Sequence, residues 1–94
     1  MGLGLEESLR LAVAALMQAT GDSQRVLAGV LGLTQTQVSR RQSGATSWTL
    51  RDVDVLAGHY EIAALDLLAG PTRACEALPA ARRRTAGAGK GVAR

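Results

Sequence analysis

The chain has almost no aromatic residues from which to build a core. It is 94 residues long and 47% hydrophobic, yet it contains one Trp, one Tyr and no Phe. Its core must therefore be made of Leu, Val, Ile and Ala, and such a composition suits packed helices better than sheets. We expect a compact all-α domain with a single hydrophobic core.

Aliphatic residues recur at helical spacing and are interrupted by glycines and capping residues. Gly21, Gly32 and Gly44 each follow a helical pattern, at the position where a left-handed residue ends a helix. Ser23 or Asp22 can cap the second helix. Thr34 with Gln37, and Thr49 with Asp52, are predicted to form capping boxes at the third and fourth helices. The five predicted helices span residues 6–20, 23–31, 34–43, 49–60 and 63–69.

The last quarter of the chain differs in composition from the rest. Residues 70–94 carry five Arg and one Lys against a single acid, Glu76, and the helical periodicity decays after Pro71. We therefore expect residues 1–70 to form the domain and residues 71–94 to be a flexible basic tail. Such a tail either neutralises phosphates without reading sequence or serves only solubility.

Positive charge is also concentrated inside the predicted domain. Residues 23–51 hold four arginines, Arg25, Arg40, Arg41 and Arg51, and no acid, whereas the acids lie on both sides of this stretch. This asymmetry indicates that one face of the domain meets a polyanion.

Several classes of function find no support in the sequence. Cys75 is the only cysteine and His59 the only histidine, and neither belongs to a nucleophile pair, a metal-ligand pattern or a phosphate loop. We expect no enzyme activity, cofactor, metal or small-molecule ligand. The apolar stretches fall short of the roughly 20 residues that cross a bilayer, so we expect a soluble, cytoplasmic, nucleoid-associated protein without membrane contact.

The second and third predicted helices carry the most informative pattern. A small Ala28 allows the two helices to cross closely, Gly32 allows a tight turn, and apolar residues fill the angle between them: Leu27, Leu31, Leu33 and Val38. The run of residues 23–40 resembles the Cro/repressor type of helix-turn-helix protein, also called the XRE family. The resemblance continues through Gly44, Leu50, Leu56, Ala57 and Ile62 to Leu68.

Four positions depart from the pattern of that family. Arg41 stands where the family usually buries an apolar residue, and its stem can cover the core while its head reaches a phosphate. Ala63 stands where a capping Ser is common. Met17 and Gln42 occupy the positions of a charged pair that ties the first helix to the third in many relatives, which is consistent with replacement of the whole pair.

The resemblance implies that the third helix, residues 34–43, enters the major groove of DNA. The residues opposite Val38 are then predicted to contact bases: Gln35, Thr36, Ser39 and Arg40. Gln pairs with adenine, Arg with guanine, and a Thr methyl touches a thymine methyl. The alternative is that they are ordinary solvated residues of a surface helix.

A second group of residues is predicted to contact DNA phosphates. It consists of Gln24, Thr34, Arg41, Ser43, Thr46 and Ser47. For the hydroxyl residues the alternative is a role in helix caps and turns. Trp48 is expected to serve packing, and His59 and Tyr60 are expected to be structural.

We expect a Cro-like transcriptional regulator, acting as a repressor, that binds a short, near-palindromic operator in double-stranded DNA as a homodimer. The dimer contacts would come from the five-helix unit or the tail. One alternative is a protein-interaction module such as an antitoxin, which an acidic face would have favoured. Another is a phage or plasmid accessory DNA-binding protein such as an excisionase.

Overall fold

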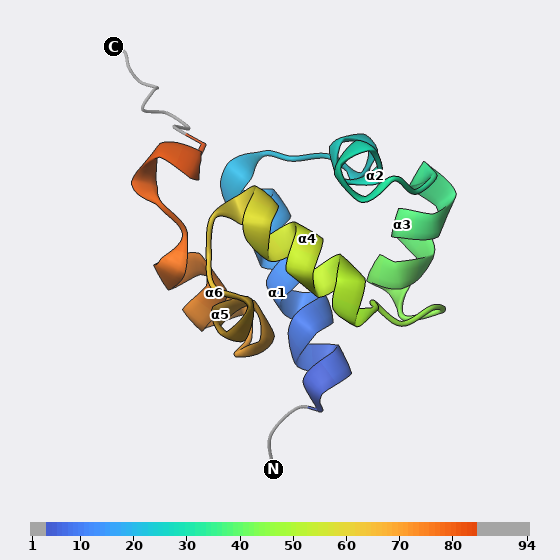
Figure 1. Cartoon of the computed structure of the whole chain (residues 1–94), viewed down its shortest axis with the longest axis horizontal. Coiled ribbons are helices and arrows are strands. Elements are labelled where there is room, and N and C mark those ends of the chain that lie inside the picture. The colour runs from blue at the N-terminus through green and yellow to red at the C-terminus, as the bar shows by residue number, and fades with distance from the viewer. Residues whose placement is uncertain (1–3, 85–94) are drawn as a thin grey trace.

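The chain folds into a set of helices joined by short turns. The computed structural model describes residues 4–84, and no strand occurs in that range, so the prediction of an all-α fold is confirmed. Figure 1 shows the elements in order: α1 (Leu5–Thr20), α2 (Gln24–Leu31), α3 (Gln35–Ser43), α4 (Leu50–Tyr60), α5 (Ala64–Leu68), α6 (Pro71–Ala77) and a 3₁₀ turn, η1 (Ala80–Arg82). None of the helices in residues 4–84 has the length and hydropathy that a membrane-spanning segment needs.

Local capping sets the boundaries of the first four helices. The Ser23 hydroxyl accepts a hydrogen bond from the Val26 backbone N–H at 3.2 Å, which decides between Ser23 and Asp22 as the cap of α2. Both predicted capping boxes are present, at the starts of α3 and α4. Because these signals act within one helical turn, the helix boundaries follow the sequence closely.

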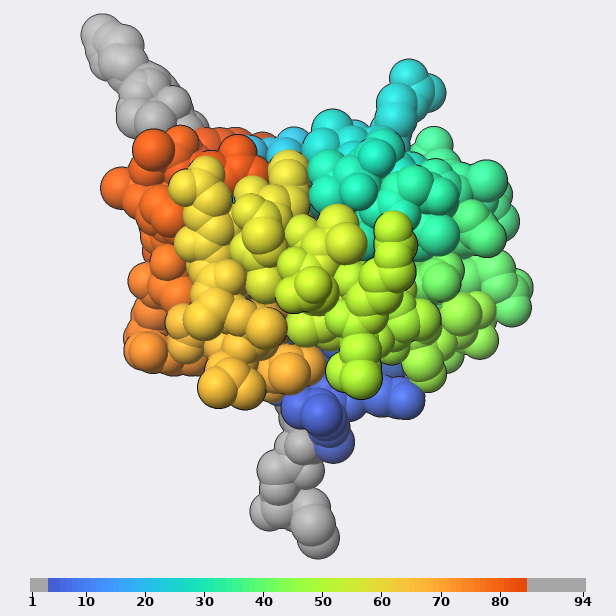
Figure 2. Space-filling view, viewed as in Figure 1, coloured from blue at the N-terminus to red at the C-terminus, as the bar shows by residue number. Residues whose placement is uncertain are grey.

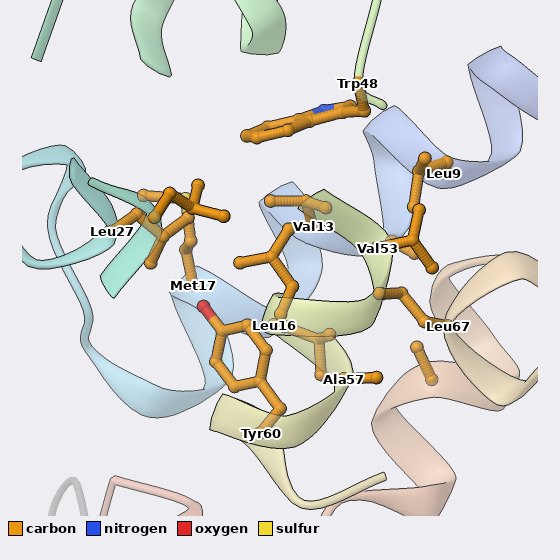
Figure 3. Packing of buried hydrophobic residues seen from close by; sticks show 14 of the residues in the cluster. Leu9, Val13, Leu16, Met17, Leu27, Trp48, Val53, Ala57, Tyr60 and Leu67 are labelled. Atoms are coloured by element: carbon orange, nitrogen blue, oxygen red, sulfur yellow. The ribbon is translucent and has the colours of Figure 1, made fainter. Parts of the chain in front are cut away.

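Helix α1 forms the centre of the molecule. One stripe of it is buried: Leu9, Ala12, Val13, Leu16 and Met17. Helices α3, α5 and α6 all pack against α1. Figure 3 shows its buried side chains meeting Val53, Ala57 and Tyr60 of α4 and Leu67 of α5. The core is aliphatic apart from Trp48 and Tyr60, as the composition predicts.

The prediction of a flexible tail from residue 71 is wrong for residues 71–84. Pro71 begins α6, which packs against α1 and α5, and Ala74 is fully buried. Leu78, just after α6, is 4% exposed. The packed unit therefore continues past the predicted boundary at residue 70, because these apolar side chains find a surface on helices distant in sequence. The rest of the predicted tail, residues 85–94, lies outside the described range.

Two arginines of the predicted tail bind the folded domain. Arg82 Nη2 donates to the His59 carbonyl at 2.9 Å, and the Arg84 backbone N–H donates to the Ala19 carbonyl at 2.8 Å. The Arg84 side chain also packs over Gly21. These contacts attach the segment after α6 to the ends of α1 and α4, where it contributes to the fold.

The end of α4 also contacts the turn between α1 and α2. His59 Nε2 lies 2.9 Å from Asp22 Oδ2, and Tyr60 is fully buried. Burial, followed by the negative charge of Asp22, raises the pKa of Tyr60 above its ordinary range. His59 and Tyr60 thus occupy structural positions.

We predict that Leu78→Ala lowers the free energy of unfolding by about 2–4 kcal/mol, because it leaves a cavity under the C-terminal segment. The same substitution at Leu65, which is 78% exposed on α5, should change it by less than about 0.5 kcal/mol. Urea denaturation of the dilute proteins measures both. Equal, small effects would show that residues 71–84 do not pack on the domain in solution.

Candidate nucleic-acid interface

Helices α2 and α3 are joined by a tight three-residue turn. Gly32 adopts φ 70°, a left-handed conformation that favours glycine, and the Leu33 backbone N–H donates to the Ala28 carbonyl at 2.9 Å. Leu27 and Val38 are fully buried between the helices. In Figure 1, α2 is seen nearly end-on while α3 lies across the view, so the two helices cross steeply. This is the geometry of a helix-turn-helix.

The outer face of α3 is open to solvent. Gln35, Thr36, Ser39 and Arg40 are all exposed, whereas Val38 is fully buried. The structure therefore brings together on one face all four residues predicted to contact bases. Contact with bases stays a prediction.

The start of α3 is held by its capping box. The Thr34 hydroxyl oxygen accepts from the Gln37 backbone N–H at 3.1 Å, and Gln37 Oε1 accepts from the Thr34 backbone N–H at 2.8 Å. The Thr34 hydroxyl serves as an acceptor here, so its O–H remains available to donate to a phosphate.

A chain of amide contacts joins α1, α2 and α3. Gln24 Nε2 donates to Gln42 Oε1 at 2.7 Å, and Gln42 Nε2 lies 3.1 Å from Met17 Sδ. Met17 and Gln42, the residues at the positions of the missing charged pair, thus meet directly. The Gln24 amide oxygen also lies 3.5 Å from Gln35 Nε2, so a predicted phosphate contact neighbours a predicted base contact.

The hydroxyls after α3 have partners within the protein. Ser43 Oγ donates to the Arg40 carbonyl at 3.0 Å, and Ser47 Oγ donates to Glu6 Oε2 at 3.1 Å. Thr46 is half-buried, and its backbone N–H donates to the Arg40 carbonyl at 3.2 Å. The hydroxyl protons of Ser43 and Ser47 are therefore already used in hydrogen bonds within the protein, which agrees with the alternative role in helix caps and turns. Whether either residue also contacts a phosphate stays a prediction.

Arg41 forms an ion pair that joins α3 to α4. Its Nε lies 2.9 Å from Asp52 Oδ2, and the two side chains are 14% and 4% exposed. The same Asp52 oxygen accepts the Thr49 backbone N–H in the capping box of α4. The structure thus gives the Arg41 charge an internal partner, and this pairing explains how a charged side chain is accommodated on the inner side of α3.

Three other arginines of residues 23–51 remain exposed. They are Arg25 in the first turn of α2, Arg40 on α3 and Arg51 in the first turn of α4, and none forms an ion pair with another residue of the range 4–84. The charge count of residues 23–51 included Arg25 and Arg51, but neither was predicted as an individual contact. Their exposure, which the sequence does not reveal, is the observation that singles them out.

Two further residues near this face have structural roles. Arg10 of α1 forms an ion pair with Glu7 and lies against Gly44, a proximity that no sequence pattern indicated. Trp48 packs on the core, as predicted, and its indole N–H is buried without a hydrogen-bond partner in the described part of the chain. A buried N–H cannot reach a phosphate, so we leave Trp48 out of the interface.

The fold and this site define a small all-helical domain with a helix-turn-helix and an exposed, basic third helix. Residues 7–88 match the model of the BetR domain family, and the chain belongs to that family. Comparison with curated proteins and with solved structures gave no match. The match runs past residue 70 and so includes α6 and η1 within the family's domain. Within residues 4–84 no cluster of metal-ligating side chains occurs.

We predict that two neighbouring arginines respond differently to substitution. Arg41→Leu should lower the free energy of unfolding by about 1–3 kcal/mol, because it leaves the buried Asp52 carboxylate without its partner. Arg40→Leu should change it by less than about 0.5 kcal/mol, since Arg40 is exposed. Thermal or urea unfolding compares the two.

A double variant tests the physical reason. Asp52→Gln keeps a side chain that can complete the capping box but removes the charge. Arg41→Leu combined with Asp52→Gln should therefore recover most of the loss. If the double variant is as unstable as the sum of the single variants, the ion pair is not what Arg41 contributes.

Proposed function

We propose that this domain is a sequence-specific DNA-binding regulator that inserts α3 into the major groove of a short operator. The observation that carries the proposal is the contrast between the two sides of α3. The residues of its outer face are exposed, while Val38, Gln42 and Arg41 tie its inner side to the rest of the domain. A rigidly held helix with a polar, uncommitted face is what direct readout of base edges requires.

The side chains of this face suit base readout. The Gln35 amide can donate and accept at an adenine edge, and the Arg40 guanidinium can make two hydrogen bonds to a guanine. Thr36 offers a methyl group for thymine, and Ser39 can bond to either kind of base. Each good bidentate contact discriminates by about 1–3 kcal/mol.

The surroundings of α3 suit the DNA backbone. Gln24 and Arg25 begin α2, whose N-terminal backbone N–H groups favour an anion, and Thr34 has a hydroxyl proton to donate. We leave Arg41 out of the phosphate contacts because it pairs with Asp52.

Membership of the BetR domain family is compatible with a regulatory DNA-binding role. The Cro-like mode of action, repression and binding as a homodimer are our finer proposal. An architectural protein such as an excisionase would instead bend its site, and gel mobility of phased sites separates bending from simple occupancy.

We predict that wild-type protein enriches a near-palindrome from random duplex DNA at physiological salt. Gln35→Ala and Arg40→Ala should each relax the preference at particular base pairs, because a base-reading side chain acts at one position. Arg73→Ala, which removes an exposed arginine from α6, serves as the matched control and should leave the preferences unchanged. Equal weakening of selected and random DNA by Arg40→Ala would remove its base-reading role, and no enrichment by wild type would contradict the proposed function.

Arg25→Ala should remove a phosphate contact. It should weaken binding to selected and random DNA by the same factor and reduce the slope of log K against log salt by about 1, because one fewer counterion is released. Titrations at several salt concentrations measure this slope. An unchanged slope would place that arginine outside the interface.

A further inference from the structure

The described part of the chain carries an apolar face that its own packing does not use. Leu5, Leu50 and Leu65 are 62%, 84% and 78% exposed, the three highest values among its large hydrophobic residues. Leu5 and Leu50 also border a hollow of about 200 Å³ that includes Leu68. Leu65 lies one helical turn before Leu68, so the three leucines and the hollow form one surface, which we call the leucine face.

The leucine face lies where the starts of α1, α4 and α5 meet. In Figure 2 the start of α1, in blue, appears at the lower edge of the molecule, between the start of α4 in yellow-green and α5 in gold. Figure 1 shows the same three elements meeting at this edge, with α3 to one side and α6 to the other. The face is therefore beside α3, and a partner bound there would leave the outer side of α3 open.

The helices themselves do not need leucine at these positions. Leu5 and Leu50 are the first residues of α1 and α4, and Leu65 is the second residue of α5. A helix start favours acidic residues, which interact well with its dipole, and an exposed leucine there gains nothing from the monomer fold. The capping and dipole of the three helices therefore do not account for leucine at these positions.

We infer that a second copy of this chain covers the leucine face in a two-fold dimer. This inference rests on the proposed function, because a nine-residue α3 reads only a few base pairs and a near-palindromic operator calls for two copies. A two-fold contact beside α3 leaves both α3 helices free to face the same DNA.

The charges at the rim support a copy as the occupant. Glu6 follows Leu5 and Arg51 follows Leu50, and both side chains are exposed. In a two-fold arrangement each residue of the rim meets a residue of the other copy, so a rim with both signs of charge can complement itself. A rim of one sign would repel its copy.

The size of the face predicts a weak dimer. Three leucines and a shallow hollow supply only part of the roughly 800 Å² that each partner of a stable complex buries. We therefore expect a dimer dissociation constant of about 10 µM to 1 mM in the absence of DNA. Binding of both copies to one operator should strengthen the dimer.

The test uses Leu50→Asp and Leu65→Asp in the full chain. Aspartate in a first helical turn is compatible with the monomer, so both variants should fold, as thermal unfolding can check. Sedimentation equilibrium without DNA should show a dimer for wild type, and each variant should raise the dimer dissociation constant at least about tenfold, because the substitution occurs twice in a symmetric contact. Val26→Asp, which alters a 43% exposed residue in the first turn of α2, is the matched control and should leave the constant unchanged.

Two outcomes overturn the inference. One is a wild-type chain that stays monomeric at about 1 mM, which would point to a different protein as the occupant. The other is a dimer that both aspartate variants leave intact, which would place the contact elsewhere. Failure of the proposed function is distinct from either, because it appears as a lack of sequence selection by a wild type that still dimerises.

Discussion

The buried stripe of α1 is the contact on which the rest of the structure depends. Ala12, Val13 and Leu16 are completely inaccessible, and α3, α5 and α6 all pack against this one helix. A core with only two aromatic residues gains its stabilisation from many small contacts, so each helix must approach α1 closely. This requirement fixes where α3 sits, and the C-terminal segment belongs to the domain because it covers the remaining side of α1.

Sequence reasoning predicted the helices well because their ends are set locally. A capping box or a left-handed glycine acts within about one turn, and both boxes, at Thr34 and Thr49, are visible in the sequence as they are in the structure. It failed at residues 71–84, where only Ala74 and Leu78 are buried. Their spacing is helical, but a single turn of small or weakly apolar residues among Ala, Gly and Arg is a faint signal, and their burial depends on a surface formed by helices distant in the sequence.

The candidate interface was predictable in outline, because Val38 marks the inner side of α3 and helical geometry then turns Thr36, Ser39 and Arg40 away from it. Gln35 lies one turn before Val38, so its exposure follows from the packing and not from the helix alone. Which arginine would form an ion pair within the protein was not predictable. Arg41 and Asp52 lie on different helices, and no spacing rule connects them. Exposure likewise distinguishes Arg25 and Arg51 from Arg41, although all three contribute equally to a charge count.

Arg40 and Arg41 are adjacent in the sequence but differ in role, because one is exposed on α3 and the other stabilises the fold. Successive residues of a helix point about 100° apart, so one arginine faces solvent while its neighbour faces α4 and neutralises a carboxylate that is 4% exposed. The exposed positive charge of residues 23–51 is therefore smaller than the sequence count, because three of the four arginines are exposed and Arg41 is paired. A modest charge on a short helix gives one copy only a limited affinity for DNA. Two copies bound side by side on one DNA raise each other's effective concentration. A weak contact through the leucine face would therefore be sufficient for tight binding of the pair.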